Sequence, residues 1–193
     1  MLATVECVRF LAGGIRLSRR SWLRSAALTA AGGVPAAASP VAPSGSAVGA
    51  KSPPLEVKTL DGSAIHVHRQ PGKVVLVDIM TTSCPSCKQA SAGIQALYEE
   101  LGSQGFLPIA LAIDPQAWRA LPLYRSLHRL TFPIGILARE EALRYLDHPA
   151  DKPMFVPTFV LLDKQSRIST KQTGWMGEQK LRSAVTALLK QKT

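Results

Sequence analysis

Two continuous apolar runs, separated by an amphipathic stretch, dominate the centre of the sequence. The runs at Val74–Met80 and 106–113 are rich in Val, Ile and Leu, which is typical of strands buried on both faces. Between them, apolar residues recur at helical spacing over 86–101, and Gly102 follows as a stop signal. This order predicts a β-α-β unit, and it leaves one feature to explain, because the acid Asp78 lies inside the first run.

Earlier in the chain, a turn signal separates two short segments that contain apolar residues. The segments 55–60 and 63–68 flank Asp61-Gly62, a dipeptide favoured in the tight turns of β-hairpins. The pattern predicts an N-terminal β-hairpin.

After the central unit, shorter segments continue the alternation of strands and helices. We expect, in order, a helix over 115–130 interrupted at Pro122, a strand over 132–137, a helix over Arg139–Leu146, a hairpin of Thr158–Leu162 with 167–173, and a closing helix over 177–190. This alternation, followed by a terminal hairpin, predicts an α/β fold with a mixed central sheet and helices on both of its faces.

Composition narrows the class of protein. The 193 residues are 46% hydrophobic and include three cysteines, which is typical of a globular chain and excludes a disulfide-stapled miniprotein. No stretch approaches the roughly 18 uninterrupted apolar residues of a membrane-spanning helix.

Residues 1–38 have the composition of an export leader. An Arg19-Arg20 pair in a basic segment resembles the twin-arginine signal, a weakly apolar run follows, and the small residues 36–38 offer a cleavage site after Ala38. An amphipathic helix or an uncleaved anchor are the alternatives, and the second would keep the protein at the membrane. We expect a signal peptide over 1–38, a flexible linker over 39–53, a folded domain over 54–193 and a periplasmic location.

The net charge of +10 lies partly in this leader. Its removal would leave +6, because residues 1–38 hold five bases and one acid. The remaining bases are scattered without interleaved aromatic residues, so a nucleic acid is not an expected partner.

The chemistry is expected at Cys84-Pro85-Ser86-Cys87, where a strand ends and a helix begins. Backbone N–H groups at the helix N-terminus stabilise a thiolate, so Cys84 is the candidate nucleophile. Cys87, one turn later, can resolve a mixed disulfide, and Pro85 fixes the first turn. A buried Asp78 beneath the motif would have a raised pKa and could take the proton from Cys87; an Asp that caps a strand end or faces solvent is its alternative.

Three other interpretations of the cysteine pair stay open. A zinc site needs two more ligands, and only histidines remain for that purpose after the leader. A structural disulfide is possible, but so small a loop confers little stabilisation. Copper carriage through both cysteines and a histidine is chemically reasonable, since thiolate and imidazole suit Cu(I). The candidate histidines are His66, His68, His128 and His148.

The order of several motifs resembles the thioredoxin-like superfamily, and within it the exported thiol:disulfide interchange proteins of the TlpA/ResA type. The matching features, over about 53–192, are the segments 73–78, 97–101 and 110–114, the two cysteines, Phe132-Pro133, Val156-Pro157-Thr158 and Gly174-Trp175. The resemblance implies a thioredoxin fold with the N-terminal hairpin and with an insertion between the second strand and a cis-proline strand.

The resemblance also implies roles and partners. Pro157 would be the cis-proline facing the cysteines, and Val156, with Pro85, would contact an extended substrate segment. The family's activity implies a protein disulfide reductase for exported proteins, including those of cytochrome c maturation. Such a reductase needs an upstream electron donor in the membrane but no cofactor or metal. We expect the protein to be a monomer. A copper-binding or disulfide-stabilised carrier without turnover is the alternative.

The sequence departs from this family at three positions. Ser83 stands where a tryptophan usually precedes the first cysteine, and Ala110 replaces the lysine that accompanies the buried acid in thioredoxins. Asp78 itself matches thioredoxins, whereas many TlpA-like proteins have Asn there. Val77 stands where the peroxiredoxin signature needs a proline, so peroxidase activity is not expected.

Overall fold

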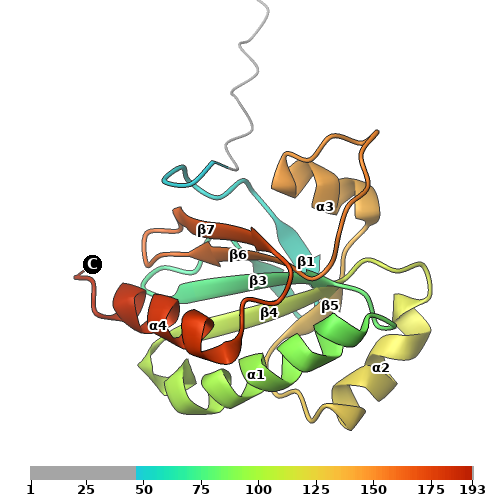
Figure 1. Ribbon diagram of the computed structural model, residues 1–193, viewed down its shortest axis with the longest axis horizontal. Helices are drawn as coiled ribbons and strands as arrows, with labels where there is room; N and C mark the ends of the chain where they lie inside the picture. The colour runs from blue at the N-terminus through green and yellow to red at the C-terminus, as the bar shows by residue number, and fades with distance from the viewer. Residues whose placement is uncertain (1–46, 193) are drawn as a thin grey trace, which may run out of the picture. The chain divides into compact units, whose positions relative to one another are not determined.

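The protein is built on a five-stranded sheet, seen in a computed structural model that describes residues 47–192. The strands lie in the order β5-β4-β3-β6-β7 (Figure 1). Strands β3, β4 and β5 are parallel, and β6 and β7 are antiparallel to their neighbours. Their bounds are Val74–Met80 for β3, Phe106–Ala112 for β4, Ile134–Ile136 for β5, Thr158–Leu162 for β6 and Ile168–Thr173 for β7.

Helices cover both faces of this sheet (Figure 1). The core on one face includes residues of α1 (Pro85–Leu101), α2 (Ala117–Leu127) and α4 (Glu178–Leu189). The core on the other includes residues of α3 (Arg139–Leu146). A short 3-10 turn, Gly102–Gln104, follows α1. The predicted mixed sheet with helices on both faces is confirmed, and α2, β5 and α3 form the expected insertion between β4 and β6.

Strand β3 is buried along its whole length, as its apolar run predicts. Because side chains alternate along a strand, Val75, Val77 and Ile79 pack on the α3 side, while Leu76 and Met80 pack on the α1 side. Asp78 lies between these last two and therefore belongs to the α1 side of the sheet. This alternation places the acid beneath the helix that carries the cysteines.

The predicted N-terminal hairpin is present. Strand β1, Glu56–Lys58, pairs antiparallel with β2, Ala64–His66, and the turn contains Gly62 at a φ of 84°. The hairpin also reaches the main sheet through a bridge between Thr59 and Gly135 of β5.

The described end of the predicted linker is held against the domain. The Gly49 N–H donates to the Ile168 carbonyl at 2.7 Å and the Ser52 N–H to the Ser166 carbonyl at 2.8 Å. The Ser52 hydroxyl lies 3.1 Å from the buried hydroxyl of Tyr145. The folded region therefore begins before Pro54. The predicted leader, its cleavage site and the linker up to residue 46 lie outside the described residues.

The predicted interruption at Pro122 is wrong, because α2 continues through it. Proline removes the N–H that would bond the Trp118 carbonyl, but this residue is 60% exposed, where water can reach it. Leu121 and Tyr124 on the buried side of the helix pack into the core and hold the segment helical. Within residues 47–192, no helix is long and apolar enough to span a membrane.

Candidate active site

The loop after β3 delivers Cys84 to the N-terminus of α1. Cys84 is the N-cap residue, with φ −72° and ψ 120°, and Pro85 occupies the first turn, as the sequence predicts. Proline is tolerated there because the first helical N–H groups have no partner within the helix. The Cys84 sulfur therefore lies at the N-terminus of α1, where the helix has unpaired backbone N–H groups and the positive end of its dipole.

The Cys84 sulfur is surrounded by hydrogen-bonding groups. The backbone N–H of Cys87 donates to it at 3.2 Å, and the Ser86 hydroxyl lies 3.1 Å away. Burial alone would raise the pKa of Cys84, but the hydrogen bonds from Cys87 and Ser86 outweigh it and lower the pKa below the usual value. A partly exposed thiol with a lowered pKa is suited to nucleophilic attack.

Cys87 has the opposite environment. It is fully buried in the core on the α1 side, and burial, the hydrogen bond with Cys84 and the charge of Asp78 together raise its pKa. Both cysteines are free thiols in the structure. The two sulfurs therefore differ, since the pKa of the partly exposed Cys84 is lowered and the pKa of the buried Cys87 is raised.

Asp78 is buried, at 1% exposure, and neither of its carboxylate oxygens has a hydrogen-bond partner. Burial raises its pKa to about 8. The register pairs Asp78 with Ala110 on β4, so the position of the missing lysine lies beside the acid on the neighbouring strand. The predicted burial of Asp78 and its raised pKa are confirmed, and its proton-transfer role stays a prediction.

The predicted cis-proline also lies at the site. The Val156-Pro157 peptide bond is cis, as the resemblance implies, and the Cys84 thiol can donate to the Val156 carbonyl at 3.8 Å. Phe155, immediately before, is 66% exposed, and its carbonyl accepts a hydrogen bond from the Thr158 hydroxyl at 2.7 Å. The start of α1 and the chain before β6, which are far apart in sequence, thus meet at the Cys84 sulfur.

A second buried polar pair near the cysteines escaped the sequence analysis. The hydroxyls of Ser91 on α1 and Tyr124 on α2 lie 2.8 Å apart in the core. Burial raises the pKa of Tyr124, with smaller contributions from the charges of Asp78 and Cys87. Ser91 lies one helical turn after Cys87, which is the signal that could have drawn attention to it.

Residues 47–192 contain no group of three or more His, Cys, Asp or Glu side chains placed to hold a metal ion. Of the candidate histidines, His68 accepts a hydrogen bond from the Leu55 N–H at 3.1 Å. The ring of His128 packs against that of Tyr124, with the two ring centroids 4.5 Å apart. His66 and His68 contact each other edge to face. The described residues thus give the copper interpretation no assembled ligand set.

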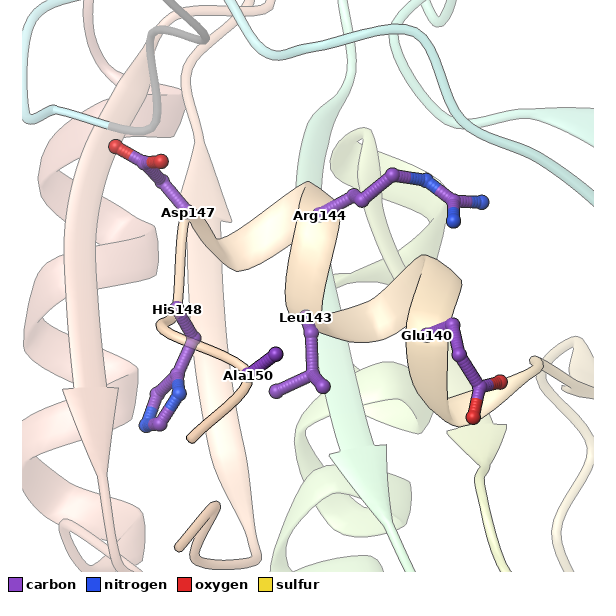
Figure 2. Close-up of a pocket in the computed structure, with 6 residues that line it drawn as sticks. All are labelled: Glu140, Leu143, Arg144, Asp147, His148 and Ala150. Carbon is purple, nitrogen blue, oxygen red and sulfur yellow. The ribbon is translucent and has the colours of Figure 1, made fainter. Parts of the chain in front are cut away.

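A pocket of about 510 Å³ lies elsewhere, on α3 and the loop that follows it (Figure 2). Figure 2 shows Leu143 and Ala150 between Glu140 and His148. Since α3 packs on the sheet face opposite α1, this pocket is not part of the cysteine site.

The comparison with protein families fits this geometry. Residues 42–188 match the Redoxin family, which is most of the chain. The chain belongs to the Redoxin family. No curated protein sequence matches this redoxin.

Solved structures share its fold. A thiol:disulfide interchange protein of the thioredoxin family from Chlorobium tepidum superposes with a TM-score of 0.66 at 19% identity, covering 74% of this chain and 98% of that one. The thioredoxin domain of a thiol-disulfide oxidoreductase from Bacteroides vulgatus gives 0.63 at 18% identity, covering 74% and 98%. StoA from Bacillus subtilis gives 0.57 at 21% identity, covering 68% and 96%. This redoxin therefore has the thioredoxin-like fold that the motif order predicts. The roles assigned to its individual residues stay predictions.

Proposed function

We propose that this redoxin is a thiol–disulfide oxidoreductase that reduces disulfides in exported proteins. One observation carries the proposal, namely the asymmetry of the two thiols at the start of α1. Cys84 is partly exposed with a lowered pKa, whereas Cys87 is buried behind it with a raised pKa. Such a pair suits attack by the first sulfur and release by the second.

The reaction has two steps. The Cys84 thiolate attacks one sulfur of a substrate disulfide, which forms a mixed disulfide and releases the other substrate sulfur as a thiolate. Ionised Asp78 then takes the proton of Cys87, whose thiolate attacks the Cys84 sulfur. The second substrate thiolate leaves, and a Cys84–Cys87 disulfide forms. The substrate has gained two electrons, and a donor dithiol must return two electrons to this redoxin.

Backbone groups beside Cys84 would hold the substrate. The Val156 carbonyl next to the Cys84 sulfur, and the chain entering Pro157, suit an extended peptide, with Pro85 at the helix start on the other side. This arrangement supports the substrate-contact roles that the resemblance implies for these three residues.

The setting of the reaction is proposed from the sequence. The twin-arginine-like segment within 1–38 supports export to the periplasm, where substrate cysteines of exported proteins, including those of cytochrome c maturation, would be met. The donor would be a membrane dithiol protein, and this redoxin would act as a monomer without a cofactor.

Trapping of the mixed disulfide tests the proposal. A full-length chain carrying Cys7→Ser and Cys87→Ser is incubated with an oxidised dithiol protein and analysed by non-reducing gel and mass spectrometry. We expect an adduct through Cys84 that dithiothreitol removes, and none from the matched Cys84→Ser chain. The carrier function would replace the proposal if the Cys87→Ser chain traps nothing, and if the chain that keeps both Cys84 and Cys87 binds Cu(I) while each single Cys→Ser variant loses it.

A further inference from the structure

The surface beside Cys84 carries an apolar groove that the proposed chemistry does not use. Its walls include Ser83 and Lys88 next to the cysteines, Leu123, Tyr124 and Leu127 on α2, and His128, which follows α2. Its volume is about 410 Å³. We call it the α2 groove. Leu123 and Leu127 are 63% and 69% exposed, although side chains of this kind usually pack away from water.

The α2 groove and the cis-proline lie on different sides of Cys84. The cysteine follows β3, the cis-proline precedes β6 on one side of β3, and α2 follows β4 on the other side. Figure 1 shows α2 beside the end of α1 at which the chain arrives from β3. A substrate chain held at Val156 and crossing the Cys84 sulfur would therefore continue toward the α2 groove.

The charges around the α2 groove select the occupant. Among the residues that line the α2 groove, Lys88 is the one lysine, arginine or acid, and it is exposed. Arg125 of α2 does not line the groove, because its Nε donates to the Leu130 carbonyl at 3.2 Å. Arg119 stacks over the exposed ring of Trp118, 4.5 Å from its centroid, at the N-terminal end of the same helix. Asp114, the acid that precedes α2, has its carboxylate oxygens engaged by the N–H and hydroxyl of Thr82, each at 2.9 Å. The α2 groove thus presents two exposed leucines beside one exposed lysine.

From this placement we infer that the α2 groove docks a substrate segment with leucine-sized side chains and carboxylates close in sequence to the reacting cysteine. Apolar contacts would exclude water around Leu123 and Leu127, and Lys88 would pair with an acid of the segment. This inference rests on the proposed function, because the segment is docked by the protein whose disulfide Cys84 attacks.

Peptides of matched length test the inference. Each carries one cysteine in a mixed disulfide with thionitrobenzoate, flanked by Leu-Glu, Leu-Lys or Ser-Gly pairs. Attack by the Cys84 thiolate forms the peptide–Cys84 disulfide and releases coloured thionitrobenzoate, so the second-order rate is read by absorbance. The protein is the full chain with Cys7→Ser and Cys87→Ser, which leaves Cys84 as the one cysteine. Hydroxyethyl disulfide, small and uncharged, provides a reference rate for each variant.

We expect the Leu-Glu peptide to react about tenfold faster than the Leu-Lys or Ser-Gly peptide. Leu123→Asp with Leu127→Asp lowers the ratio of the Leu-Glu rate to the reference rate about tenfold. Lys88→Glu reverses the order of the Leu-Glu and Leu-Lys peptides, a ratio in which any change in Cys84 reactivity cancels. Val48→Asp is the matched control, because Val48 is 67% exposed and its neighbour Gly49 bonds Ile168, at the sheet end away from Cys84.

Two failures are distinguishable. Equal rates for the three peptides, or ratios that the α2 variants leave unchanged, would overturn the docking inference and leave the proposed exchange chemistry standing. A Cys84 thiol that attacks neither the peptides nor hydroxyethyl disulfide would overturn the proposed function itself.

Discussion

At the scale of single residues, the resolving step depends on the proton balance between Asp78 and Cys87. Because burial raises the pKa of Asp78 to about 8, the ionised form that accepts the Cys87 proton becomes abundant as pH rises through that value. We predict that release of substrate from the mixed disulfide speeds up between about pH 6 and pH 9. Asp78→Asn should slow this release at least tenfold and remove the pH dependence near 8.

The rate at which Cys87 releases the substrate is measured by quenching the reaction with acid and quantifying the remaining mixed disulfide by mass spectrometry. The first attack, by Cys84, serves as the internal control in the same protein. An Asp78→Asn chain with the pH profile of the unchanged protein would exclude the proton-transfer role.

The lowered pKa of Cys84 gives a second prediction at this scale. The Ser86 hydroxyl is one of the groups near the Cys84 sulfur that lower its pKa. Ser86→Ala should therefore raise the pKa of Cys84, measured from thiolate absorbance at 240 nm in a chain carrying Cys7→Ser and Cys87→Ser. Ser83→Ala, on the other side of the cysteine, is the matched control. Equal pKa values for the two variants would contradict the assignment.

Sequence reasoning reached these residues unevenly. The positions of Cys84 and Cys87 at the helix start follow from local spacing, and the burial of Asp78 follows from its apolar neighbours. The cis form of Pro157 came from resemblance alone, because local sequence favours trans for any X–Pro bond. The Ser91–Tyr124 contact was missed, since its partners are 33 residues apart and on different helices.

At the scale of elements, the hairpin is fixed to the sheet by close contact at β5. A Cβ added at Gly135 would lie 2.5 Å from the Lys58 carbonyl oxygen, which is backbone and cannot move away alone. Gly135→Ala should therefore lower the free energy of unfolding by about 1–3 kcal/mol, measured by urea denaturation. A variant with an unchanged denaturation midpoint would show that the hairpin does not need this contact.

Element predictions succeeded where the pattern was strong and local. The Asp61-Gly62 turn signal located the hairpin, and the apolar runs located β3 and β4. Two details depended on tertiary contacts that the sequence does not display. Helix α2 continues through Pro122 because its buried side packs into the core, and residues 49–52 are held by hydrogen bonds to the start of β7 and the turn before it.

At the scale of the whole molecule, the buried acid makes stability depend on pH. The folded chain keeps Asp78 protonated up to a pKa of about 8, whereas the unfolded chain releases that proton near 3.8. The folded state therefore binds more protons in this window, so the contribution of Asp78 to stability is fully present below about pH 4 and is lost as pH rises toward 8. The gap between 3.8 and about 8 corresponds to about 6 kcal/mol at 1.36 kcal/mol per pH unit.

Urea denaturation at pH 5 and pH 8 measures this dependence, and Asp78→Asn should flatten it. Asp61, with a pKa lowered to about 2, titrates below the window and does not interfere. Stability that rises over this range in the unchanged protein, and equally in Asp78→Asn, would contradict the buried neutral acid.

If Cys84 and Cys87 form a redox centre, the pair must exchange electrons reversibly with dithiothreitol and glutathione buffers. The full chain is equilibrated with each buffer, alkylated and digested. The mass of the peptide that contains Cys84 and Cys87 then shows what fraction of the pair is reduced. We predict a two-electron equilibrium with a potential near the thioredoxin value of about −270 mV, as a reductase requires. A potential near about −120 mV would reverse the proposed direction, and a pair that never equilibrates with either buffer would show that these cysteines are not a redox centre.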